Sequence, residues 1–183
     1  EHNTALVAEN EKLLEYLLTI KDNLRYCTEE DDLSEVRREL IALGLIREKQ
    51  NGKKPAPEKP VKPLHYQVGG FDIYVGKNNV QNNQVTFKLA KSGDLWLHTQ
   101  KIHSSHVVIL AADKQIPDSV IQTAAEICAY YSQANGGTKI AVDFTDRANV
   151  KKPPKAPLGF VIYPTYETIL VDPDRHGEYL LNK

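Results

Sequence analysis

A segment rich in proline and lysine limits what this chain can fold into. Residues 51–63 read NGKKPAPEKPVKP and contain four prolines, four lysines and an Asn-Gly pair. Proline cannot continue a helix, and a segment of this composition has few side chains to bury. We therefore predict a linker here, which separates a short helical region, residues 1–50, from a larger domain, residues 64–183.

The N-terminal region has the periodicity of two helices. Apolar residues recur at spacings of three and four over residues 6–26, which draws one apolar stripe on a helix. An acidic cluster at 29–32 precedes a second periodic run at 33–43, and Gly44 suits the left-handed position after a helix end. Periodicity leaves two interpretations open: a helical hairpin that covers a core, or a coiled-coil limb that ends in a short docking helix.

The larger domain has the pattern of an α+β fold. Residues 66–68 and 71–75 alternate on either side of a two-glycine turn, which is typical of a β-hairpin. One long helix is expected over residues 117–135, because a proline suits its start and an Asn-Gly-Gly run its end. Further strands are predicted at 85–90, 106–110, 140–144, 160–163 and 168–171. Six or seven strands and one long helix predict a mainly antiparallel sheet covered on one face.

The charge is divided unevenly along the chain. Residues 1–50 carry seven Lys/Arg against twelve Asp/Glu, whereas residues 51–183 carry sixteen against twelve. An acidic arm on a mildly basic domain indicates a polyanionic partner for that domain. A hydrophobic share of 41% without any long apolar run excludes a disordered tail and predicts no membrane insertion. The chain begins with Glu, contains no Met and shows no secretory signal pattern, so we expect a part of a longer protein.

The run DLWLH holds the only tryptophan of the chain. Side chains of a strand point alternately to opposite faces, so Leu95 and Leu97 are expected to share the core face. Asp94, Trp96 and His98 then share the other face. Either Trp96 fills a covered face, with the acid and the imidazole as hydrogen-bonding partners at its rim, or the three side chains form an open ledge on which a base or sugar stacks.

A second candidate for recognition is the run GKNNVQNN at residues 76–83. Asparagine favours turns, but this density of amides also supplies paired donors and acceptors without charge. Lys77 and Lys88 would provide phosphate contacts nearby. The basic, rigid loop at 151–155, KKPPK, is a further candidate for phosphate contact.

The sequence offers little to catalysis or metal binding. The spacing of His98, His103 and His106 matches no compact ligand pattern. Ser105, His106 and Asp94 can be combined into a triad on paper, but a nucleophile-elbow pattern is missing, as are a phosphate loop and a dinucleotide fingerprint. We therefore expect no enzyme activity, no metal and no cofactor. A hydrolase that uses Asp94 and the histidines is the weakest alternative.

Four segments of the larger domain form an ordered set of motifs: GKNNVQNNQVTFKLAKSGDLWLHTQKIHSSHVVIL at 76–110, AAEICAYYSQA at 124–134, VDFT at 142–145 and NVKKP at 149–153. This set resembles the NFACT-R domain that ends the fibronectin/fibrinogen-binding protein A family, whose bacterial members are similar to RqcH-type ribosome quality-control factors. Residues 32–46, DLSEVRRELIALGLI, resemble the returning limb of the middle coiled coil in that family.

The resemblance implies an RNA-binding module of a cytoplasmic translation-rescue factor, with tRNA and RNA of the large ribosomal subunit as partners. The alternative that it implies is a fragment of an adhesin, displayed at the bacterial surface, that binds host fibronectin or fibrinogen. The motif residues and the basic loop together give these candidates for RNA binding: Lys77, Asn78, Asn79, Gln81, Asn82, Lys88, Asp94, Trp96, His98, Ser105, His106, Lys151 and Lys152.

Overall fold

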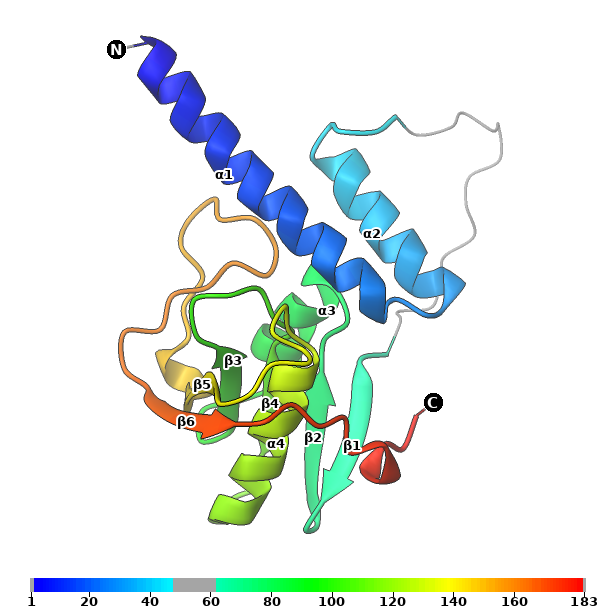
Figure 1. The fold of residues 1–183 in the computed structure, drawn as a ribbon, viewed down its shortest axis with the longest axis vertical. Helices are drawn as coiled ribbons and strands as arrows, with labels where there is room; N and C mark the ends of the chain where they lie inside the picture. Colours follow the sequence, from blue (N-terminus) through cyan, green and yellow to red (C-terminus); the bar gives the residue numbers. More distant parts are fainter. Residues whose placement is uncertain (1, 48–61, 183) are drawn as a thin grey trace.

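The computed structural model describes residues 2–47 and 62–182 (Figure 1). The two predicted N-terminal helices are α1 (His2–Asn23) and α2 (Glu30–Ala42), joined by a 3₁₀ turn (Leu24–Tyr26). Gly44 follows α2 with a left-handed φ of 72°, as expected. Most of the predicted linker, residues 51–61, lies outside the described residues.

The first half of α1 projects away from the rest of the molecule, whereas its second half and α2 lie against it (Figure 1). Leu6, Val7 and Leu14 are exposed on the projecting part. Ile20 of α1 and Val36 of α2 are buried closer to the domain. The projecting part of α1 therefore covers no core within the described residues.

In the described part of the chain, six strands form one antiparallel sheet in the order β1-β2-β4-β3-β5-β6. The strands are β1 (Leu64–Val68), β2 (Phe71–Val75), β3 (Leu95–Thr99), β4 (Val107–Leu110), β5 (Ile140–Asp146) and β6 (Glu167–Val171). Gly69 and Gly70 join β1 to β2 with φ values of 57° and 80°, the conformation that a two-residue hairpin turn requires. The predicted α+β fold with an antiparallel sheet is confirmed.

One face of the sheet is covered by the predicted long helix, α4 (Asp118–Tyr130). Ala124, Ala125 and Cys128 of α4 are fully buried in the main core. Because these side chains are small, the helix approaches the sheet closely enough to bury Leu97 and Val107 completely.

The opposite face is covered as well, as the covered-face alternative for Trp96 requires. A second core there contains Val85, Ala90, Trp96, Val108 and Val150. It is closed by a π-helical segment (Val85–Leu89), which follows α3 (Asn79–Gln84), and by the segment 147–163. The central strand β4 is apolar on both faces, and both faces are therefore removed from water.

Two predicted strands are wrong. Residues 85–89, expected to be a strand from their alternation, continue α3 as a π-helical turn in which Ala90 N donates to Val85 O at 3.0 Å. The alternation of apolar and polar residues predicted a strand here, but the preceding asparagine-rich run is a helix rather than a turn, and residues 85–89 continue that helix. Residues 160–163 form no strand, and only Ile162 pairs there, through an isolated bridge to Lys151.

Candidate nucleic-acid interface

Asp94 holds the turn that precedes β3. Its side chain is buried, with Oδ1 accepting from Ala111 N at 2.8 Å and Oδ2 from Lys91 N at 2.7 Å. Both carboxylate oxygens are therefore engaged by backbone amides of this chain. The open ledge predicted as one alternative for Asp94 is wrong, because the carboxylate closes a local turn instead.

Trp96 is fully buried in the second core, with an exposed fraction of 0%. Its indole Nε1 donates to Thr86 Oγ1 at 3.1 Å, and its ring lies 4.8 Å from that of Tyr163 between centroids. The open stacking ledge is therefore wrong, and Trp96 fills a covered face of the sheet instead. The cover was not visible in the sequence because it comes from the π-helical segment and from residues 147–163.

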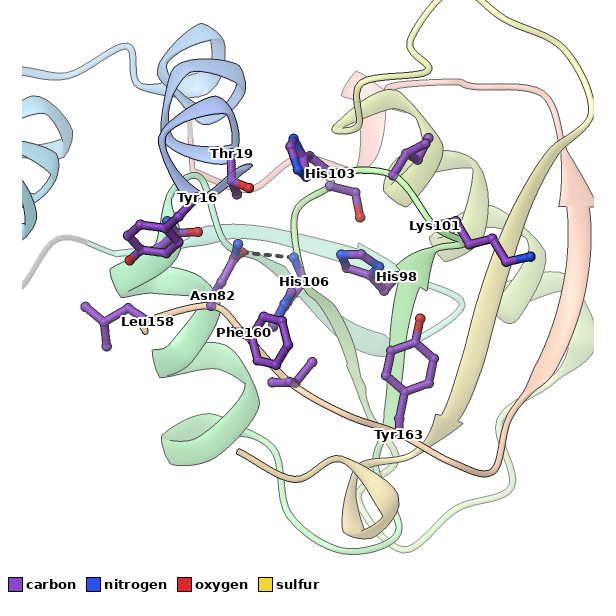
Figure 2. Close-up of a pocket in the computed structure, with 15 residues that line it drawn as sticks. Tyr16, Thr19, Asn82, His98, Lys101, His103, His106, Leu158, Phe160 and Tyr163 are labelled. Atoms are coloured by element: carbon purple, nitrogen blue, oxygen red, sulfur yellow. Dashed lines mark hydrogen bonds between the residues drawn. The ribbon is translucent and has the colours of Figure 1, made fainter. Parts of the chain in front are cut away.

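His98 marks the edge of this buried cluster. Its ring is half-buried and lies parallel to that of Trp96, with 5.6 Å between centroids and 2° between planes. Burial lowers the pKa of His98 from 6.5 to about 4, so the imidazole is neutral near pH 7. Unlike Asp94 and Trp96, His98 reaches a cavity at the surface (Figure 2).

His106 lies beneath the same cavity. Its backbone amide donates to Asn82 Oδ1 at 2.9 Å, and its Nδ1 lies 2.8 Å from Thr86 Oγ1. Burial, together with the neighbouring His98, lowers the pKa of His106 well below its ordinary value. Ser105 is fully buried and does not line the cavity.

The asparagine-rich run binds the acidic helix of its own chain. Five side chains of this run were predicted to bind RNA; all five are buried, and four of them donate to a carboxylate of α2. The pairs are Lys77 Nζ–Asp32 Oδ2 at 2.6 Å, Asn78 Nδ2–Glu35 Oε2 at 3.0 Å, Asn79 Nδ2–Glu39 Oε1 at 3.0 Å and Gln81 Nε2–Asp32 Oδ1 at 3.0 Å. In this structure, α2 occupies the place that we had expected an RNA ligand to take.

Four basic residues form what we call the basic strip: Lys88, Arg147, Lys151 and Lys152. The three lysines are exposed, and Lys152 Nζ donates to Asn83 Oδ1 at 3.4 Å. Arg147 donates from Nε to the Thr86 carbonyl, and its guanidinium lies 4.8 Å from the centre of the Phe87 ring. These contacts hold residues 83–88 against residues 147–152, and the two segments together carry the basic strip.

A surface cavity of about 300 Å³ lies between α1, α3, the end of β3 and two loops (Figure 2). Four of the predicted site residues line it: Asn79, Asn82, His98 and His106. Lys101, Phe160 and Tyr163 also line the cavity and were not among the predicted site residues. Tyr163 and Phe160 lie in a segment predicted to be a strand, and nothing in its pattern indicated that it would fold over the sheet.

No group of three or more His, Cys, Asp or Glu side chains that could hold a metal ion occurs in residues 2–47 and 62–182. Within the same described ranges, no helix has both the length and the apolar character needed to cross a membrane.

Exposed lysines beside a cavity with uncharged rings are typical of domains that bind nucleic acid, and the fold of this domain is α+β. The family model described as the NFACT protein RNA binding domain matches residues 64–161. This chain belongs to the NFACT RNA-binding domain family, and the resemblance inferred from its motifs is confirmed.

Curated relatives extend the match over most of the chain. It is 40% identical over 154 residues to the Rqc2 homolog RqcH of Bacillus subtilis (strain 168), which covers 83% of this chain and 27% of that protein. It is 36% identical over 174 residues to the Rqc2 homolog RqcH of Streptococcus suis (strain 05ZYH33), covering 94% of this chain and 31% of that protein. The chain thus spans less than a third of the length of these relatives.

A solved structure has the same fold. It is described as the C-terminal of the fibronectin/fibrinogen-binding protein from Streptococcus suis, and it superposes with a TM-score of 0.88 at 33% sequence identity. The superposition covers 98% of this chain and 72% of that chain.

Proposed function

We propose that this chain is the RNA-binding module of a cytoplasmic ribosome quality-control factor and has no catalytic activity of its own. The family match over residues 64–161 supports the RNA-binding part of the proposal. The relatives named Rqc2 homolog RqcH support the quality-control part. As partners we propose tRNA and RNA of the large ribosomal subunit.

The observation that carries the proposal is the basic strip, Lys88, Arg147, Lys151 and Lys152. Its lysines are exposed, and no carboxylate lies within ion-pair distance of their amines in the described structure. Lysines of this kind neutralise phosphates and release condensed counterions, which makes RNA binding depend steeply on salt. Lys77, by contrast, is engaged by Asp32 and contributes nothing to this surface.

The test is RNA affinity at several salt concentrations. Fluorescence anisotropy would measure binding of a tRNA, and of a fragment of large-subunit RNA, between roughly 50 and 200 mM salt. The double variant Lys151→Ala/Lys152→Ala should bind about tenfold more weakly and show a salt dependence shallower by about one to two phosphate contacts. The matched control is Lys114→Ala/Lys139→Ala, which removes the same charge from exposed positions outside the strip.

Affinity that is independent of salt, or an equal loss in both double variants, would contradict the proposal. The same titration against fibronectin and fibrinogen tests the adhesin alternative. Tight binding of a matrix protein without measurable RNA binding would replace the proposed function by that alternative.

A further inference from the structure

Segments from several parts of the sequence meet at the cavity of about 300 Å³. Asn82 comes from α3, His98 from the end of β3, and Phe160 and Tyr163 from the segment that closes the second core. A volume of this size lies at the lower end of the range for small-ligand pockets, about 300–1,000 Å³. It suits one planar ring system better than a large ligand.

Flat and uncharged rings form part of the cavity wall. Figure 2 shows the rings of His98, Phe160 and Tyr163 gathered around the same space. Phe160 is 52% exposed and stands at the mouth. The hydroxyl of Tyr163 donates to Asp143 Oδ2 at 3.3 Å, which holds this ring in place before any ligand enters.

The polar groups of the cavity are mostly neutral. His98 and His106 are uncharged near pH 7, for the reasons given above. His103 Nδ1 lies 3.2 Å from Asp22 Oδ2, and Lys101 is exposed at the rim. The inner part of the cavity offers little positive charge to bind a phosphate. A neutral heteroaromatic ring could stack on the aromatic side chains and form hydrogen bonds with the imidazole and amide groups.

The basic strip begins beside the wall of this cavity. Asn82 lines the cavity, and the next residue, Asn83, accepts from Lys152 Nζ. A phosphate held by Lys152 therefore lies close to the cavity. We propose that the cavity binds one unpaired nucleobase of the RNA whose phosphates lie on the basic strip.

This inference rests on the proposed function and makes it more specific. A base inside a duplex is stacked on both sides and cannot enter the cavity, so recognition requires a single-stranded or looped nucleotide. Stacking on an aromatic side chain is tolerant of base identity. The module would thus distinguish unpaired from paired RNA without reading a long sequence.

The test uses short single-stranded RNA oligonucleotides with the full chain. One set carries an abasic site at each position in turn, and another carries 2-aminopurine, whose fluorescence is quenched on stacking. An abasic site at the bound position and the variant Phe160→Ala should each weaken binding roughly tenfold, and Phe160→Ala should abolish the quenching. Because Phe160 is exposed at the mouth, the variant is expected to fold, which circular dichroism would verify.

The matched control is Ile162→Ala, in the same segment. Ile162 is 50% exposed and does not line the cavity, so its loss should leave both readouts unchanged. If every abasic oligonucleotide binds as tightly as the intact one while Lys151→Ala/Lys152→Ala still weakens binding, the base pocket is wrong and the proposed function stands. If no RNA binds at all, both proposals are overturned.

Discussion

Lys77 Nζ and Asp32 Oδ2 form an ion pair of 2.6 Å, and the exposed fraction of the side chain is 6% for the lysine and 0% for the aspartate. The lysine belongs to the cap region of α3, and the aspartate to the first turn of α2. This pair and the amide contacts around it attach the N-terminal arm to the domain. The orientation of α2 relative to the RNA-binding domain is therefore set by buried polar groups, not by apolar packing alone.

Lys77→Ala is expected to destabilise the protein by about 3–5 kcal/mol, because removing one partner of a buried ion pair leaves the other charge uncompensated. Urea denaturation would measure the change. Lys88→Ala, which removes an exposed lysine, should change the free energy of unfolding by no more than about 0.5 kcal/mol. Equal effects of the two variants would show that the Lys77–Asp32 pair does not hold the arm.

Thr86→Val tests the hydroxyl that joins two aromatic side chains of the second core. Thr86 Oγ1 accepts from Trp96 Nε1 at 3.1 Å and contacts His106 Nδ1 at 2.8 Å. The isosteric valine keeps the volume and leaves both ring nitrogens without this partner, at an expected cost of about 1–3 kcal/mol. Thermal or urea unfolding is the measurement. Thr123→Val on the outer side of α4 is the control, and a cost as large there would contradict the assigned role.

The pKa of His98 predicts a loss of stability in acid. Its folded-state pKa of about 4 lies below the ordinary value of 6.5, so the unfolded chain binds the proton more readily. Stability should therefore be complete above pH 6.5 and decrease as the pH falls from 6.5 toward 4. His98→Phe keeps a ring against Trp96 but cannot be protonated, and it should show a smaller loss of stability over this range.

His176 provides a control of opposite sign. Burial lowers its pKa, but hydrogen bonds to Glu126 and Glu178 outweigh burial and raise it overall. The contribution of His176 is thus present below its ordinary pKa and is lost as the pH rises through the raised value. His176→Gln should cost more stability at pH 5.5 than at pH 8.5. The same pH profile for the His98 and His176 variants would contradict both assignments.

Gly76→Ala should disturb the start of α3. A Cβ atom at this position would lie 2.6 Å from Asn82 N and 2.9 Å from Asn82 Cα, and backbone atoms cannot move aside without shifting the helix. We expect a loss of about 1–3 kcal/mol, measured by urea denaturation. Gly177→Ala is the matched control, because a Cβ atom there meets nothing within 4 Å. A neutral Gly76→Ala would show that the close approach is not needed.

Features with a local cause could be predicted from the sequence. The two-glycine hairpin turn, the start of α4 after Pro117 and the position of Gly44 after α2 each follow from residues within a few positions of one another. The antiparallel sheet followed from the same local patterns, and the motif order indicated the correct family. The inward direction of Leu97 followed from simple alternation along a strand.

The candidate site depended on contacts between distant segments. Lys77 meets Asp32 across 45 residues, and Trp96 is covered by Tyr163 from far along the chain. Local periodicity says which side chains of a strand share a face, but not which segment covers that face. An amide or lysine also has the same local signature whether its partner is a phosphate or a carboxylate of its own chain. The sequence by itself therefore determined the elements and the family, and only the tertiary structure decided which polar groups remain free to bind RNA.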